Sequence, residues 1–208
     1  MKSKNRLFLA LGGTALVLSL ASGCSSTNKN PDAPLEMQVE ETKVVEQGVP
    51  GGVATRTTKL RATVTDINYE TRSITLEDSD GNSKTVEVGP EAQKFDQIAK
   101  GDTVAIEYIE EQVIYLNDAD KHEEDKAALV ASNEKEDGSP GAMAIEVIEL
   151  VATVTAVDLE NHSVTLTFSN GKTVEQNVRP DVEILESHVG RQVVIRHTNA
   201  FALEIEKQ

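Results

Sequence analysis

The sequence contains no tryptophan, only 3% aromatic residues and a single cysteine, Cys24. With so few aromatic side chains, any core must be built from valine, isoleucine and leucine. A single cysteine excludes an intramolecular disulfide. Hydrophobic residues make up 38% of the 208 residues, which is low for one large core. The composition therefore favours two small domains.

Positive charge is also scarce, with 20 basic residues against 35 acidic ones and a net charge of −15. Three of the basic residues, Lys2, Lys4 and Arg6, precede Cys24, and no acidic residue does. The chain from Cys24 onward therefore carries 17 basic and 35 acidic residues, a net charge of −18. Such a surface repels phosphate backbones, so no nucleic-acid partner is expected. It also repels an anionic bilayer, so membrane contact would need an anchor.

The first 24 residues suggest such an anchor. After the basic start, the apolar run Leu7–Ala21 is too short to span a bilayer and is typical of an export signal. The run closes on Ala21-Ser22-Gly23-Cys24, which resembles the lipobox of bacterial lipoproteins. That resemblance implies cleavage before Cys24, diacylglycerol on its thiol and an acyl chain on its new amino group. An ordinary signal followed by an incidental cysteine is the alternative.

The lipoprotein resemblance also implies a location. Ser25 follows Cys24, where an aspartate would indicate retention in the inner membrane, so we expect the outer membrane, facing the periplasm. Two or more acyl chains give stable anchoring, where one gives marginal binding. We therefore expect a lipoprotein signal peptide at 1–23 and membrane contact through lipid on Cys24. Residues 24–52, rich in polar residues, proline and glycine without a sustained period, are expected to be a flexible tether.

Two segments of the remaining chain have closely similar sequences, which we call the shared phrase. Ala62–Gly81 reads ATVTDINYETRSITLEDSDG, and Ala152–Gly171, 90 positions later, reads ATVTAVDLENHSVTLTFSNG. Alternating apolar and polar residues with many β-branched side chains predict strands, and the clusters of Asp, Asn, Ser and Gly predict turns.

The similarity continues beyond the shared phrase. Pro90 and Pro180 each open a predicted short helical segment, Gly101 and Gly190 each end it, and two more strands follow in each copy. These features predict an all-β fold of two tandem OB-like small β-barrels of about five strands each. Barrels this small would each be marginally stable alone.

The predicted domains follow from the repeat. The first barrel is expected at 53–117, an acidic connector at 118–147 and the second barrel at 148–208. Within the connector, Asp120 can cap a short helix through Ala131. A solvated connector is favoured over an acidic arm that binds a partner.

No pattern of reactive residues indicates catalysis or a metal. The acidic hairpin beginning at Asp78 lacks the spacing of an EF-hand loop. No serine lies in a nucleophile elbow. No histidine has a partner at i+4 or a nearby cysteine; the four are His122, His162, His188 and His197. The sequence therefore predicts no catalytic residue, no metal site and no cofactor, and it indicates a protein that is not an enzyme.

Two resemblances rest on the repeats. The shared phrase, followed by FDQIAKGDTV at 95–104, resembles a family of mostly uncharacterised exported bacterial proteins with OB-like barrels. A looser likeness is to periplasmic copper and silver chaperone barrels, which bind metal through a His, two Met and a Trp. The corresponding hairpin here, Asp78–Val88, has none of these, and Met37 and Met143 lie outside the predicted barrels. The fold is therefore implied, and the metal site is not.

Together these features predict a lipid-anchored envelope protein of non-enzymatic type that acts as a binding or protein-interaction module, with another envelope protein as its expected partner. A periplasmic accessory protein for metal handling is the alternative. The sequence leaves the ligand and the oligomeric state open.

Overall fold

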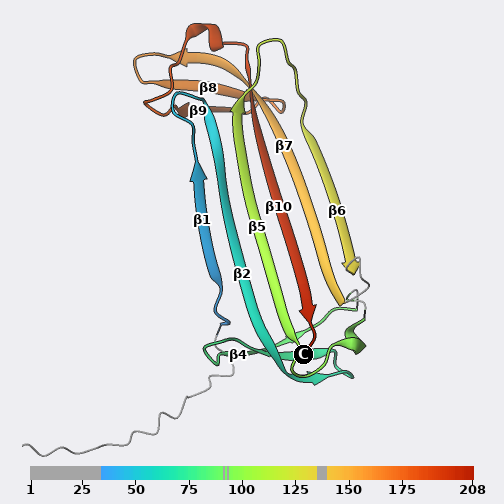
Figure 1. Ribbon diagram of the computed structural model, residues 1–208. Helices are drawn as coiled ribbons and strands as arrows, with labels where there is room; N and C mark the ends of the chain where they lie inside the picture. The colour runs from blue at the N-terminus through green and yellow to red at the C-terminus, as the bar shows by residue number, and fades with distance from the viewer. Residues whose placement is uncertain (1–33, 91, 93, 135–139) are drawn as a thin grey trace, which may run out of the picture.

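The computed structural model describes residues 34–90, 92, 94–134 and 140–208 (Figure 1). In these residues the regular structure is β, apart from the short 3-10 helices η1 (Phe95–Gln97) and η2 (Glu186–His188), so the all-β prediction is confirmed. The strands are β1 (Gln38–Val44), β2 (Gly51–Asn68), β3 (Ser73–Glu77), β4 (Ser83–Glu87), β5 (Thr103–Leu116), β6 (Lys126–Glu134), β7 (Pro140–Asp158), β8 (Ser163–Phe168), β9 (Thr173–Asn177) and β10 (Gln192–Glu206).

All ten strands belong to one antiparallel sheet with the order β4-β3-β2-β5-β10-β7-β8-β9, to which β1 adds beside β2 and β6 beside β7. The sheet is open, so the two predicted barrels are not formed. The reason lies in β5 and β10. The sequence predicts two strands at the end of each repeat, but in each case one long strand runs straight through and pairs with its counterpart. Neither copy can then close on itself.

The predicted repeat is confirmed, because β1–β5 and β6–β10 follow the same order in the sheet. Details recur at matching positions. A β-bulge follows Val64 in β2 and Val154 in β7. The Gly101 N–H donates to the Val64 carbonyl at 2.8 Å, and the Gly190 N–H donates to the Val154 carbonyl at 2.8 Å. The shared phrase at 62–81 and 152–171 therefore encodes the same local structure twice.

The two copies are related by a pseudo-twofold axis through the middle of the sheet. In the β5–β10 pair Glu110 lies opposite Asn199, and these two residues also occupy the same place in their own repeats. An axis perpendicular to the sheet at this pair exchanges the repeats. In Figure 1 the four long strands run side by side, with β8 and β9 at one end and β4 at the other.

Each repeat has its own hydrophobic core, and both cores lie on the same face of the sheet. Val104 packs in the first core and Leu116 against the second. They stand an even number of residues apart in β5, whose pairing with β10 is regular, so their side chains share a face. We call this the core-bearing face. The buried members of the first core are Ala62, Val64, Ile74, Leu76, Phe95, Ile98, Val104 and Ile205; those of the second are Ala152, Val154 and Leu166.

The last strand of each repeat ends in the core of the other repeat. Ile205, near the end of the second repeat, is 5% exposed inside the first core, and Leu116, at the end of β5, packs against the second core. Polar contacts fasten both ends. The Lys207 ammonium lies 2.6 Å from the buried Asp102 carboxylate, and the Arg191 guanidinium donates to the Asn117 carbonyl. Neither core is complete without the other repeat.

Two segments differ from the sequence predictions. The predicted tether 24–52 contains β1, and the connector 118–147 contains β6 where a helix through Ala131 was expected. Both strands lie along a long strand, with Thr42 opposite Thr55 and Val130 opposite Ile145. Hydrogen bonds from these neighbours outweigh the weak local preferences of the two segments.

The exchanged strand end yields a prediction. Ile205→Ala should lower the free energy of unfolding by about 2–5 kcal/mol, because it empties a buried position in a well-packed core. Denaturant unfolding of the variant beside wild type measures this. Leu159→Ala, at a side chain that is 55% exposed, is the control, and it should change stability by no more than about 0.5 kcal/mol. A loss at Ile205 as small as that of the control would mean that the first core does not need the second repeat.

Candidate functional site

The predicted lipid-attachment residue, Cys24, lies outside the described residues. Within the described part of the chain, no helix has the length and apolar character needed to cross a bilayer.

The four histidines lie apart from one another. His122 is exposed in the loop before β6, His162 lies in the turn after β7, His188 ends η2 and His197 lies midway along β10. Two of them have structural contacts, since a ring nitrogen of His162 lies 3.1 Å from the Arg179 carbonyl and His188 Nδ1 accepts the Leu185 N–H. Over the ranges that the structure describes, no three His, Cys, Asp or Glu residues form a group that could hold a metal ion.

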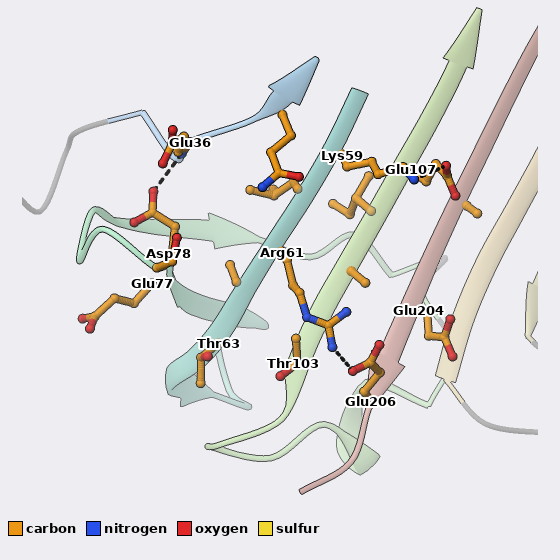
Figure 2. Close-up of a pocket in the computed structure, with 17 residues that line it drawn as sticks. Glu36, Lys59, Arg61, Thr63, Glu77, Asp78, Thr103, Glu107, Glu204 and Glu206 are labelled. Carbon is orange, nitrogen blue, oxygen red and sulfur yellow. Dashed lines mark hydrogen bonds and ion pairs between the residues drawn. The ribbon is translucent and has the colours of Figure 1, made fainter. Parts of the chain in front are cut away.

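An open cavity of about 660 Å³ lies over one end of the sheet (Figure 2). We call it the acidic groove. Its floor includes Lys59, Arg61 and Thr63 of β2, which alternate with the core residues and so point away from the core-bearing face. Six carboxylates line the groove: Glu36, Glu77, Asp78, Glu107, Glu204 and Glu206.

The two basic residues of the acidic groove are already paired. Lys59 lies 3.2 Å from Glu107, and Arg61 forms an ion pair with Glu206, which Figure 2 shows reaching across from β10. These exposed pairs contribute little to stability. The groove as a whole keeps an excess of negative charge.

Asp78 organises the wall of the acidic groove. Its buried carboxylate accepts hydrogen bonds from the Glu36 N–H at 2.8 Å, the Asp80 N–H at 3.0 Å, the Asn82 N–H at 2.9 Å and the Asn82 side-chain amide at 3.0 Å. The bond from Glu36, followed by those from Asn82 and Asp80, outweighs burial and lowers the pKa of Asp78. With its oxygens taken by these donors, Asp78 fastens the segment before β1 to the β3–β4 hairpin.

Glu36 behaves differently. It is exposed at the rim of the groove, where a hydrogen bond with Asp80 and the negative charge of that neighbour raise its pKa. Within one wall of the acidic groove, the pKa of Glu36 is therefore raised and the pKa of Asp78 is lowered.

A second cavity, of about 440 Å³, lies on the core-bearing face, between the second core and the β1–β2 hairpin. We call it the apolar cavity. Its walls come from three parts of the chain: the second core, the inner side chains of β5 and β10, and the segment 176–188 with the β1–β2 hairpin. Val154, Leu166 and Ile184 are among the side chains that line it. Its lining is largely aliphatic, which suits an uncharged ligand better than an ion.

Searches of protein-family models, of curated proteins and of solved structures find no match to this chain.

The sequence patterns described above did not predict that β1 and β6 belong to the repeats. A signal for this exists: Gly48-Val49-Pro50-Gly51 recurs 90 positions later as Gly138-Ser139-Pro140-Gly141. The structure gives the reason at Gly51, which has φ +98° and where a Cβ would lie 1.9 Å from the Ile114 carbonyl oxygen. Only glycine allows the hairpin to approach β5 this closely. That hairpin forms part of the apolar cavity.

The Asp78 contacts yield a prediction with a defined pH dependence. Because folding lowers the pKa of Asp78, the stabilisation from its carboxylate is present above the ordinary value of about 3.9 and is lost as the pH falls through the lowered value. The amide proton of Glu36 should therefore keep a hydrogen-bonded NMR shift at neutral pH and lose it only well below pH ~4.

Asp78→Asn should weaken this hydrogen bond and remove the loss of the hydrogen-bonded shift at low pH, whereas Asp96→Asn, at an exposed carboxylate outside the acidic groove, is the control and should leave the Glu36 amide titrating as in wild type. A Glu36 amide shift that titrates normally in Asp78→Asn would contradict the assignment.

Proposed function

We propose that this chain is a lipid-anchored envelope protein of non-enzymatic type, and that it acts as a binding or protein-interaction module. The observation that supports this best is the open middle of the sheet. Sheets in globular domains are covered on at least one face, because a bare apolar face costs free energy. Here the middle of β5 and β10 carries large apolar side chains that are only half-buried on both faces.

The side chains at this middle section have the composition of an interface. On the core-bearing face Tyr108 lies opposite Phe201, and on the other face Ile109 lies opposite Ala200. Polar groups are interspersed: the Tyr108 hydroxyl lies 3.3 Å from Asn199 Oδ1. Aromatic side chains beside satisfied polar groups are typical of surfaces that bind proteins.

The expected partner is another envelope protein. The basic start, the apolar run and Cys24 support export and acylation, which would hold the folded body at the membrane. By the lipoprotein resemblance, the membrane is the outer one and the body faces the periplasm. A partner for the middle section would then be found in the same compartment.

Site-directed photo-crosslinking in intact cells tests the interaction. A photoreactive residue at position 108 or 201 should give the same single adduct, because these neighbours would face one partner surface. The same residue at position 70 or 170, in exposed turns at the two ends of the sheet, serves as the control and should give no such adduct. Equal adducts from all four positions, or none, would contradict an interaction through the middle section.

The anchor is tested separately by Cys24→Ala. This change should abolish labelled-palmitate incorporation and block lipoprotein-type processing, because the thiol that would carry the diacylglycerol is gone. The variant should either stay uncleaved or appear as soluble protein, and its circular dichroism should match wild type, since the described sheet begins at Gln38. Absence of label in the wild type would contradict the assignment of Cys24 as a lipid-attachment site.

A further inference from the structure

The first repeat fills its interior with an aromatic ring. Phe95, from the segment between β4 and β5, is 4% exposed and belongs to the first core. The Tyr69 ring meets it edge-on, with centroids 5.9 Å apart, and the Arg72 guanidinium lies 4.6 Å from the Phe95 centroid. Tyr69 also donates from its hydroxyl to the Ile98 carbonyl at 2.7 Å. The ring is thus held on two sides by groups that complement an aromatic face.

The second repeat has no ring at the place of Phe95; its Phe168, in β8, packs against the second core but does not line the apolar cavity. Leu159 stands in the place of Tyr69, His162 in the place of Arg72, and the segment 180–190 contains no aromatic residue other than His188. The buried apolar side chains of this segment are Val182 and Ile184. They do not join the second core cluster, as Phe95 and Ile98 join the first.

The apolar cavity lies where the ring is missing. It is bounded by Val182 and Ile184 and by the counterparts of the residues that cluster with Phe95. The pairs of first-core residue and cavity-lining counterpart are Val64 and Val154, Ile74 and Val164, Leu76 and Leu166, Val104 and Val193, and Ile205 and Leu116. The second repeat therefore has counterparts of the aliphatic side chains that surround Phe95 in the first core, but no aromatic ring among them.

The rim of the apolar cavity is tied in place. Arg179 donates to the carbonyls of Glu46, Val49 and Gly51 in the β1–β2 hairpin and also pairs with Asp181. The Gly48 N–H donates to Asp181 at 3.0 Å. The Arg179 guanidinium is engaged by these partners, so it offers no free charge to a ligand, and the hairpin is fixed as one wall.

We propose that the apolar cavity of the second repeat binds a small uncharged molecule that carries an aromatic ring, in the place that Phe95 occupies in the first repeat. The volume of about 440 Å³ lies within the range of small-molecule sites. A ring would contact the aliphatic walls that already accommodate a ring in the first repeat, and its dispersion contacts would replace those that an empty cavity forfeits.

The polar groups at the rim favour an uncharged ligand from solution. Besides Arg179, the lining includes the exposed Lys43 and Glu183 and the half-buried His188, whose Nδ1 is occupied by the Leu185 N–H. Lys43 and Glu183 carry opposite charges, so the opening has no net charge that would select an ion. A ligand bound here would not depend on an interaction through Tyr108 and Phe201.

NMR titration of the whole chain from position 24, with Cys24→Ala so that no acyl chain competes, tests the proposal. The probes are benzene and indole, with cyclohexane as the saturated compound of similar size. Methyl signals of Val154, Leu166 and Ile184 should shift to saturation with the aromatic probes, while those of Val64 and Leu76 in the filled repeat should not move.

Two kinds of variant test the proposal in opposite directions: one fills the apolar cavity, and the other removes the ring from the first core. Ile184→Phe should supply the missing ring and weaken aromatic binding at least tenfold; Leu166→Phe, from the opposite wall, replaces it if the first variant does not fold. Phe95→Ala should create a second site, seen as new saturable shifts at Val64 and Leu76. No saturation in the wild type, unchanged affinity in the folded filling variant, or cyclohexane binding as tightly as benzene would each overturn the proposal.

Discussion

The pairing of β5 with β10 is the interaction on which the rest of the structure depends. Each strand begins beside the core of its own repeat and ends beside the core of the other, from Thr103 opposite Glu206 to Leu116 opposite Val193. Because side chains alternate along a regular strand, residues that serve both cores must share one face. The two cores are consequently on the same side of the sheet, and the strands between them are left without a covering layer.

This arrangement lets the two copies diverge in detail while keeping one topology. Asp102 binds Lys207 at one end, whereas the corresponding places at the other end hold Arg191 and Asp118, so the signs of the charges are reversed. The hydrogen bond from Lys121, together with the positive charges of Lys121 and, to a lesser extent, Arg191, lowers the pKa of Asp118. The aromatic filling of the first core likewise has no counterpart in the second. Equivalent backbones thus enclose a packed interior in one repeat and an apolar cavity in the other.

Local patterns in the sequence were enough to predict the β class, the repeat, and the hairpins and turns at the ends of the sheet. Alternation and turn residues at 62–81 and 152–171 depend on near neighbours in the chain. The open sheet could not be predicted in this way, because it depends on whether Ile109–Glu111 forms a turn or continues a strand. That choice is decided by pairing with Ala200, far away in sequence. The apolar cavity could not be predicted either. The absence of a phenyl ring from segment 180–190 indicates a cavity only when the structure shows that Phe95 occupies the equivalent place in the first core.

The exchanged strand ends also govern when this chain can fold. Domains commonly fold from the N-terminus as they are synthesised, but the first repeat lacks part of its core until residue 205 is available. Contacts such as Arg61 with Glu206 join residues 145 positions apart, and such distant contacts slow folding. A partly synthesised chain therefore cannot complete its N-terminal core, and both repeats reach their final packing only when the last strand has been made.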